Sequence, residues 1–297
     1  MALRRIVELG GVGVSLAVDD ALARRIRSSA LWAGARDRAV HVPPNGSART
    51  LPSPAAAESA AARALREGVS RLNWYHSIAL PEGIVTPGEF DHAPYLAHYP
   101  IPARLDGMRA LDVATFDGYW AFEFERRGAA EVVALDIGAV GEGDLQPALR
   151  ARTDPDILSH ATGAGFRFAK EALGSKVRRE VLSVYELSPE RVGMFDFVFC
   201  GDLLLHLMNP VKALERIRSV LKGEAIFVDC FSPHLPGKTA EYRGGSTRCV
   251  WWSVSLDCLQ QMIADANFGD VTLLDKFKIG HRGEKPWMWR AVFRARP

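Results

Sequence analysis

The sequence predicts a doubly wound α/β fold, with a mostly parallel, seven-stranded, Rossmann-like sheet preceded by a helical N-terminal extension. The chain has 297 residues, 48% of them hydrophobic, which is enough to bury a large core. From residue 108 onwards, short apolar runs alternate with helical segments. Strands that are apolar throughout and are joined by helices are typical of a parallel sheet covered on both faces.

Residues 1–70 are predicted to be the helical extension, which serves as a lid or in dimerisation. A first helix is expected over 19–38, where an aspartate cap precedes apolar positions at helical spacing. A Pro-, Gly- and Ser-rich loop is expected over 42–54, followed by an alanine-rich helix over 54–72. Both a closing lid and a homodimer contact are left open for this extension.

Residues 71–297 are predicted to form one domain. Its first part, 71–105, is rich in aromatic residues and prolines, and such a long irregular segment in a compact protein is usually functional. The strands are expected at 109–114, 131–136, 177–184, 195–201, 224–229, 271–277 and 287–295. The main helices between them are expected at 118–128, 155–173, 210–221 and 255–267.

In an open parallel sheet, ligands bind beyond the carboxyl ends of the strands. The loop after the first strand has Ala114 and Phe116 where a pyrophosphate-binding loop needs glycines, and keeps only Gly118. A nicotinamide enzyme is therefore disfavoured, and a ligand without phosphate fits better. Asp136 ends the second strand, 24 residues after Asp112, where an acid can accept hydrogen bonds from ribose hydroxyls.

The ends of the third and fourth strands carry further candidates. Tyr185 follows the third strand, where an aromatic ring either packs on a purine or caps the core. The fourth strand ends at Cys200 and Gly201, and the chain continues through Asp202 to His206. Asp202 and His206 are four residues apart, so they would share one face of a helical turn.

Three stretches resemble class I S-adenosylmethionine (SAM)-dependent methyltransferases: WYHSIALPEGIVTPG, LDVATFDGYWAFEFERRGAAEVVALD and FDFVFCGDLLLHLMNPVKALERIRSVL. They are most similar to the branch that includes the tRNA wobble-uridine carboxymethyltransferases. The resemblance covers about residues 70–297 and implies that SAM is the cofactor. The cofactor-binding residues that it implies are Asp112, Ala114, Thr115, Gly118, Asp136, Ile137, Val184, Tyr185, Cys200 and Gly201.

Two departures from the pattern of this family change the expectation. The family's glycine-rich loop is here Ala-Thr-Phe-Asp-Gly, over residues 114–118. The carboxymethyl-transferring members have a tyrosine before the histidine after the fourth strand, and this chain has Leu205 before His206. Because that tyrosine helps to recognise a carboxylated cofactor, we expect plain SAM and the transfer of a methyl group.

Methyl transfer from a sulfonium is an in-line displacement, so positioning of the acceptor contributes most. An oxygen or nitrogen acceptor also loses a proton, and histidine is the usual base near pH 7. The candidate catalytic residues are His206 and His76. The candidate substrate residues are Trp74, Tyr75, Trp251, Trp252 and His234, and the candidate partners of an anionic group are Arg243, Arg248 and Arg290. Each candidate also has an ordinary explanation as a packed or solvated side chain.

Composition limits the partners. The four cysteines show no metal-ligand or C-x-x-C spacing, so we expect neither a metal site nor a disulfide. No apolar run approaches the ~20 residues that a membrane span needs, and a cytoplasmic enzyme is expected. RNA-binding domains usually have a pI above about 9. The net charge of +2 and the pI near 8.4 favour a small-molecule acceptor, such as one in a biosynthetic pathway. A tRNA-modifying enzyme and a non-catalytic SAM-fold binding module are the alternatives.

Overall fold

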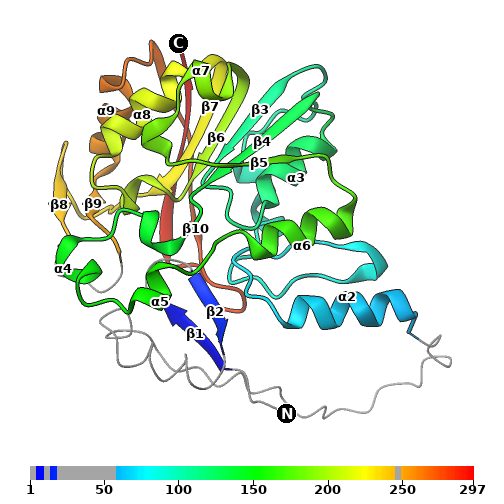
Figure 1. The fold of residues 1–297 in the computed structure, drawn as a ribbon. Coiled ribbons are helices and arrows are strands. Elements are labelled where there is room, and N and C mark those ends of the chain that lie inside the picture. The colour runs from blue at the N-terminus through cyan, green and yellow to red at the C-terminus, as the bar shows by residue number, and fades with distance from the viewer. Residues whose placement is uncertain (1–4, 10–13, 19–57, 245–248) are drawn as a thin grey trace.

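The computed structural model describes residues 5–9, 14–18, 58–244 and 249–297 (Figure 1). Its strands are β1 (Arg5–Leu9), β2 (Val14–Val18), β3 (Arg109–Val113), β4 (Glu131–Asp136), β5 (Arg178–Val181), β6 (Phe195–Gly201), β7 (Leu221–Cys230), β8 (Ala240–Tyr242), β9 (Trp252–Val254), β10 (Asp270–Ile279) and β11 (Met288–Arg296). The α-helices are α2 (Ala60–Ser70), α3 (Tyr119–Arg126), α4 (Pro147–Arg150), α5 (Pro155–Leu158), α6 (Ala164–Leu173), α7 (Pro189–Val192), α8 (Pro210–Ser219) and α9 (Leu256–Asp265). The 3₁₀-helices are η1 (Pro81–Gly83), η2 (Ala93–His98), η3 (Val140–Glu142), η4 (Val184–Glu186) and η5 (Leu204–His206).

The main sheet has seven strands in the order β10-β11-β7-β6-β3-β4-β5. Strands β3 to β7 run parallel, whereas β11 is antiparallel to both of its neighbours, β7 and β10. The chain moves from β3 outwards to β5 and returns with β6 on the other side of β3, so a switch point lies between β3 and β6. The prediction of a doubly wound, mostly parallel sheet is confirmed. No helix within the described ranges has the length and apolarity needed to cross a membrane.

The predicted helix over 155–173 is wrong as a single element. The structure has α5 and α6 instead, and α6 begins after Gly163, whose φ is 74°. The Arg179 side chain fills the space beside this glycine, where a Cβ would lie 2.7 Å from its guanidinium carbon. Arg179 also donates to the Thr162 hydroxyl over 2.9 Å. This packing of Arg179 against an earlier segment of the same chain holds residues 159–163 out of helical geometry.

The N-terminal extension differs from the expectation in two respects. Strands β1 and β2 pair as an antiparallel hairpin, which the sequence did not predict. The helix expected over 54–72 begins at Ala60, because the Ser59 side chain accepts a hydrogen bond from the Ala62 backbone N–H over 2.9 Å. The helix predicted over 19–38 and the loop predicted over 42–54 lie outside the described residues.

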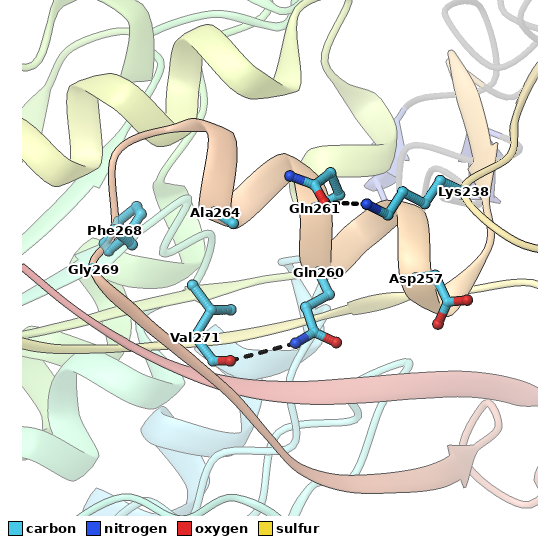
Figure 2. A pocket seen from close by; sticks show the side chains of 8 residues that line it. All are labelled: Lys238, Asp257, Gln260, Gln261, Ala264, Phe268, Gly269 and Val271. Carbon is cyan, nitrogen blue, oxygen red and sulfur yellow. Dashed lines mark hydrogen bonds between the residues drawn. The ribbon is translucent and has the colours of Figure 1, made fainter.

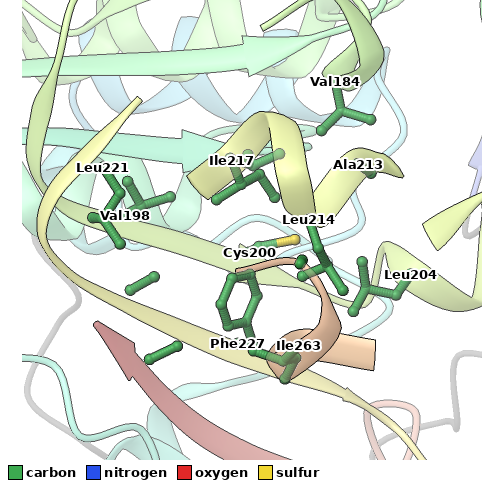
Figure 3. Close-up of a cluster of buried hydrophobic side chains, with 14 of the residues drawn as sticks. Val184, Val198, Cys200, Leu204, Ala213, Leu214, Ile217, Leu221, Phe227 and Ile263 are labelled. Carbon is green, nitrogen blue, oxygen red and sulfur yellow. The ribbon is translucent and has the colours of Figure 1, made fainter. Parts of the chain in front are cut away.

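Helices cover both faces of the main sheet. On one face, α8 buries Ala213, Leu214 and Ile217, whose spacing places them on one side of the helix (Figure 3). On the other face, α3 buries Phe122 against Phe166 of α6, with 5.3 Å between the ring centroids. The two apolar layers fix the sheet, and with it the loops at both strand ends.

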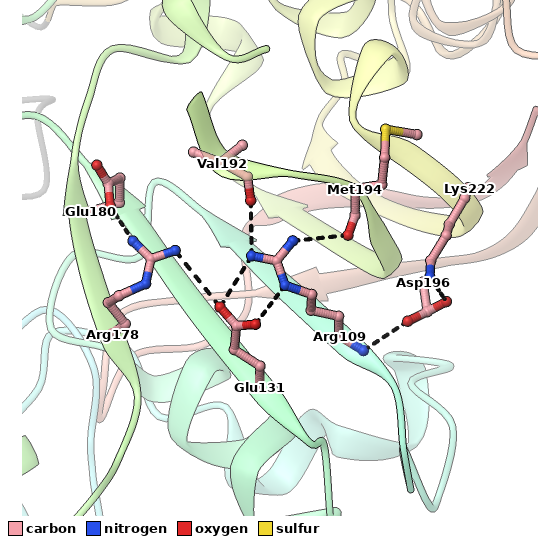
Figure 4. Close-up of polar contacts among 8 residues, drawn as sticks. All are labelled: Arg109, Glu131, Arg178, Glu180, Val192, Met194, Asp196 and Lys222. Carbon is pink, nitrogen blue, oxygen red and sulfur yellow. Dashed lines mark hydrogen bonds and ion pairs between the residues drawn. The ribbon is translucent and has the colours of Figure 1, made fainter. Parts of the chain in front are cut away.

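The amino ends of β3 and β4 are joined by polar contacts (Figure 4). The Arg109 guanidinium donates to Glu131, with 2.6 Å between Nε and Oε2. It also donates to the carbonyl oxygens of Val192, over 2.8 Å, and Met194, over 3.0 Å. Asp196 accepts the backbone N–H of Arg109 over 2.8 Å. The donors of this arginine are thus engaged at the surface.

Candidate functional site

The loop after β3 is held in a backbone conformation that favours glycine. Ala114 has a φ of 61°, Phe116 of 52° and Gly118 of 94°. Gly118 is required, because a Cβ there would lie 2.6 Å from the ring of Phe122. Left-handed alanine and phenylalanine are strained, and such strain is concentrated at functional sites.

Asp136 at the end of β4 ties this loop to the neighbouring strand. Its carboxylate accepts the N–H of Phe116 on one oxygen and the N–H of Ile137 on the other, both over 2.8 Å. Burial raises the pKa of Asp136. A carboxylate has about four acceptor positions, so two remain for ribose hydroxyls. Asp136 can therefore accept hydrogen bonds from the ribose of SAM. The nucleoside of SAM needs no phosphate-binding loop.

Asp112 lies underneath the same loop rather than on its surface. The side chain accepts the Thr115 hydroxyl over 2.6 Å and the Ala121 N–H over 3.2 Å. It is 1% exposed, and burial raises its pKa to about 7. The structure thus gives Asp112 and Thr115 contacts that shape the loop.

The segment before the sheet brings His76 to this loop through a carboxylate. Asp117 is 2% exposed, and its Oδ1 lies 2.9 Å from His76 Nδ1. Its Oδ2 accepts the backbone N–H groups of Tyr75, over 2.8 Å, and of His76, over 3.1 Å. A proton on Nδ1, donated to Asp117, leaves His76 Nε2 with a lone pair, which is the arrangement of an oriented histidine base. Sequence reasoning singled out His76 but missed Asp117.

His92 backs this dyad from the protein interior. Its ring centroid lies 5.3 Å from that of His76, and its Nδ1 lies 2.9 Å from the Tyr99 hydroxyl. Burial, followed by the neighbouring His76, lowers the pKa of His92, so the ring is neutral near pH 7. His92 Nε2 is buried without a hydrogen-bond partner. No local motif marked this residue in the sequence.

His206 follows β6, at the end of the 3₁₀-helix η5. Its Nδ1 donates to the carbonyl oxygen of Cys249 over 3.0 Å, and burial lowers its pKa. The predicted helical turn shared with Asp202 is wrong, because η5 contains only Leu204–His206 and Asp202 has a φ of 52°. The irregular backbone arises where the chain leaves β6 at a sharp angle.

Asp202 meets a buried cation instead. Arg290 of β11 is 2% exposed, and its Nε lies 2.5 Å from Asp202 Oδ1. It pairs in register with Cys230 of β7, because antiparallel β11 brings its first residues to the carboxyl ends of the parallel strands. Arg290 Nη1 is buried and has no hydrogen-bond partner among the residues that the structure describes.

The remaining cofactor candidates lie along the same strand ends. Val184 is buried, and the Tyr185 hydroxyl donates to Asp144. The Cys200 side chain is 1% exposed within the apolar layer under α8, so only its backbone and Gly201 face the strand end.

The aromatic candidates divide into packed and accessible side chains. Trp74 is 3% exposed and donates to the Val69 carbonyl oxygen over 3.0 Å, so it belongs to the core. Trp251 is 7% exposed and donates to the Asp144 carbonyl oxygen over 2.6 Å. Tyr75 is half-buried, with its ring centroid 5.2 Å from that of Phe116. Of these three, only Tyr75 contacts the loop after β3.

Two further candidates lie beyond the end of β7. Trp252 is half-buried and donates to the Met208 carbonyl oxygen over 3.2 Å. His234 is exposed on the loop after β7. Arg243 pairs with Glu241 over 3.0 Å, and Arg248 lies outside the described residues.

A surface pocket of about 470 Å³ lies apart from these residues, along α9 and the start of β10 (Figure 2). Lys238 donates to Gln261 over 2.5 Å, and Gln260 donates to the Val271 carbonyl oxygen over 3.4 Å. Because its polar groups bond to one another, we place the candidate site at the carboxyl ends of the strands.

Comparison with known proteins identifies the domain. Residues 111–228 match a family model described as a methyltransferase domain. The chain is 28% identical over 176 residues to the tRNA U34 carboxymethyltransferase of Campylobacter concisus, and 30% identical over 126 residues to that of Campylobacter hominis. It is 29% identical over 131 residues to the ubiquinone biosynthesis O-methyltransferase of Xanthomonas axonopodis pv. citri. These alignments cover 58%, 42% and 43% of this chain, and 53%, 36% and 46% of the respective relatives.

A solved structure supports the same fold. The N-terminal domain of EvdMO1 with S-adenosylhomocysteine (SAH) bound aligns with a TM-score of 0.52 at 16% identity, covering 79% of this chain and 95% of that chain. The predicted class I methyltransferase fold is therefore confirmed, and residues 111–228 within it match a methyltransferase domain.

Proposed function

We propose that this chain, which carries a SAM-dependent methyltransferase domain, transfers a methyl group from SAM to a small-molecule acceptor. The observation that carries the proposal is the His76–Asp117 dyad, attached to the strained loop after β3. An oriented histidine beside a cofactor loop has the chemistry needed to deprotonate an acceptor.

The roles of the residues follow from their contacts. SAM supplies a methyl group on a positively charged sulfonium. Asp136 offers its remaining acceptor positions to the ribose, and Gly118 lets the loop turn into α3. Asp117 holds the His76 ring and keeps its proton on Nδ1, so that Nε2 accepts the proton of the acceptor. The rings of Tyr75 and Phe116 would exclude water from one side of the bound cofactor. Their aromatic faces would stabilise the positively charged sulfonium.

A small-molecule acceptor is favoured by the charge of the described surface. Basic side chains close to β8 and to η4 are paired with acids, as in Arg243 with Glu241 and Arg191 with Glu186. RNA binding relies on clustered cations that neutralise phosphates. Paired arginines leave a weaker positive field, which suits a compact acceptor.

A tRNA acceptor is the second candidate. It is favoured by the names of the curated relatives from Campylobacter, which are tRNA U34 carboxymethyltransferases. We infer it only as an alternative because Leu205 replaces the tyrosine expected for a carboxylated cofactor.

The test begins with calorimetric titration of the purified protein with SAH. We expect micromolar binding, and a folded protein that does not bind SAH would contradict the proposal. Incubation with methyl-labelled SAM then compares two acceptor pools, a small-molecule extract and unmodified tRNA. Label in the small-molecule pool supports the first candidate, and label in tRNA alone supports the second.

A further inference from the structure

The ion pair between Asp202 and Arg290 has a feature that packing alone does not explain. Arg290 is a buried cation with five N–H donors, and its Nε lies 2.5 Å from Asp202 Oδ1 in an ion pair. Within the described part of the chain, neither this Nε nor Nη1 has a partner in hydrogen-bond geometry. Its Nη2 contacts the Met288 sulfur at 3.8 Å. Buried guanidinium groups are normally surrounded by hydrogen-bond acceptors. The unsatisfied donors of Arg290 therefore suggest that its positive charge has a role in the site.

The carboxylate of Asp202 is the more exposed member of the ion pair, and the arginine is the more deeply buried one. The Asp202 side chain is 19% exposed, compared with 3% for Arg290. Asp202 directly follows β6 at the switch point, where a ligand of this fold lies. It has a left-handed φ of 52°, a conformation that aspartate adopts more readily than most residues. In this position its carboxylate contacts the Arg290 guanidinium.

The surroundings add negative rather than positive charge. Asp229 at the end of β7 is 2% exposed and uses its carboxylate to accept the N–H groups of Leu204 and Cys230, both over 2.7 Å. Burial and the nearby Asp202 carboxylate raise the pKa of Asp229 to about 7. An additional anion placed next to Asp202 would therefore be repelled, because Arg290 is already neutralised.

We propose that Asp202 is a specificity-determining residue, which occupies Arg290 and so excludes donors whose transferred group carries a carboxylate. The sulfonium donor with an uncharged methyl group is accepted, and its carboxymethyl analogue is rejected. This inference rests on the proposed function and assigns the choice of donor to the Asp202 side chain. Discrimination by an unfavourable charge is a common basis of specificity.

The test compares three ligands by calorimetry: SAH, SAM and the carboxymethyl sulfonium analogue of SAM. We expect the wild-type protein to bind SAM at least tenfold more tightly than the analogue. Asp202→Asn keeps the shape and tolerates the left-handed backbone, but it frees Arg290. In this variant we expect the ratio of the two affinities to shift towards the analogue by at least tenfold, with SAH affinity unchanged within threefold.

A matched control is Asp257→Asn, the same change at an exposed aspartate of α9, which should keep the wild-type ratio. Asp202→Gly, which fits the backbone, serves if the asparagine variant does not fold. Equal binding of SAM and the analogue to the wild-type protein would overturn the inference. So would an unchanged ratio in Asp202→Asn that still binds SAH. Absence of SAH binding to the folded wild-type protein would instead overturn the proposed function, and this inference with it.

Discussion

Two arginines on the same sheet have opposite environments at its two ends. At the amino end, Arg109 bonds to Glu131 and to the carbonyl oxygens of Val192 and Met194. At the carboxyl end, Arg290 is almost fully buried, and among the acidic side chains that the structure describes it forms an ion pair with Asp202 alone. The first arrangement satisfies its donors, and the second leaves donors unsatisfied in the interior.

From this difference we infer that the amino ends of the strands serve stability and the carboxyl ends serve binding and chemistry. Satisfied polar groups at the surface contribute modestly to stability, whereas unsatisfied buried groups persist where a ligand or a reaction needs them. Substitutions at the carboxyl end should therefore change binding and chemistry, and substitutions at the amino end should change stability alone. Four substitutions test this separation.

The largest effect is expected for His76→Gln. Loss of the oriented base should lower the rate of methyl transfer to an oxygen or nitrogen acceptor by roughly 10²–10⁴-fold. SAH binding should stay within threefold, because the Asp117 contacts with backbone N–H groups remain. Single-turnover rates with an acceptor from the label screen measure the effect. The exposed His160→Gln serves as the control, and an equal rate in His76→Gln would exclude the base role.

The next largest effect is expected for Asp136→Ala, which is compared with a substitution at the other end of strand β4. Asp136→Ala should weaken SAH binding by about 100-fold, because it removes two charge-assisted hydrogen bonds to the ribose. The control is Glu131→Ala at the other end of the same strand, which should bind SAH as the wild-type protein does. Calorimetric titration of both variants decides the matter. Unchanged affinity in Asp136→Ala would place the nucleoside elsewhere.

A smaller effect is expected on the pH dependence of stability in Asp112→Asn. Burial gives Asp112 a pKa of about 7 in the folded protein, above the ~3.9 of an unfolded aspartate. Between these values the folded chain holds a proton that the unfolded chain has lost, so this stabilisation disappears as the pH rises through 7. The fall in the free energy of unfolding from pH 5 to pH 8 should be smaller in the variant, by on the order of 2 kcal/mol. Urea unfolding at both pH values measures it, and identical falls would contradict the assignment.

The smallest effect is expected for Glu131→Gln at the amino end. Its carboxylate is 44% exposed, and exposed ion pairs contribute about 0–1 kcal/mol. Thermal unfolding should shift slightly at low salt and less at high salt, with SAH affinity unchanged. A loss of SAH binding in this variant would show that the two ends are coupled, and the separation would be wrong.

The sequence predicted the parts of the fold that depend on local pattern. Strands 131–136 and 195–201 were placed at their observed bounds, because buried parallel strands are uninterrupted apolar runs. The helix over 155–173 was wrong because its break depends on Arg179 packing against Gly163, a contact between distant residues.

Site residues were likewise predictable where their role depends on local position, and not where it depends on a contact between distant residues. Asp136 follows from its position at a strand end, whereas Asp117 gains its role from His76, which lies 41 residues away. Arg290 was noted as a candidate partner of an anion, but nothing local pairs it with Asp202, which follows another strand, β6. Long-range pairs of this kind depend on the order of strands in the sheet, which periodicity does not encode.

That order of strands also bears on how the chain is made. Synthesis produces β10 before β11, yet β11 lies between β10 and β7 in the sheet. Until β11 has been made and has folded, the edge of β7 that pairs with it has no strand neighbour, and β10 has no strand to pair with. A pause at this stage exposes a strand edge that chaperones or other nascent chains can bind. The Asp202–Arg290 ion pair cannot form until β11 pairs with β7. The proposed selection of the methyl donor therefore requires that all the parallel strands have been made first.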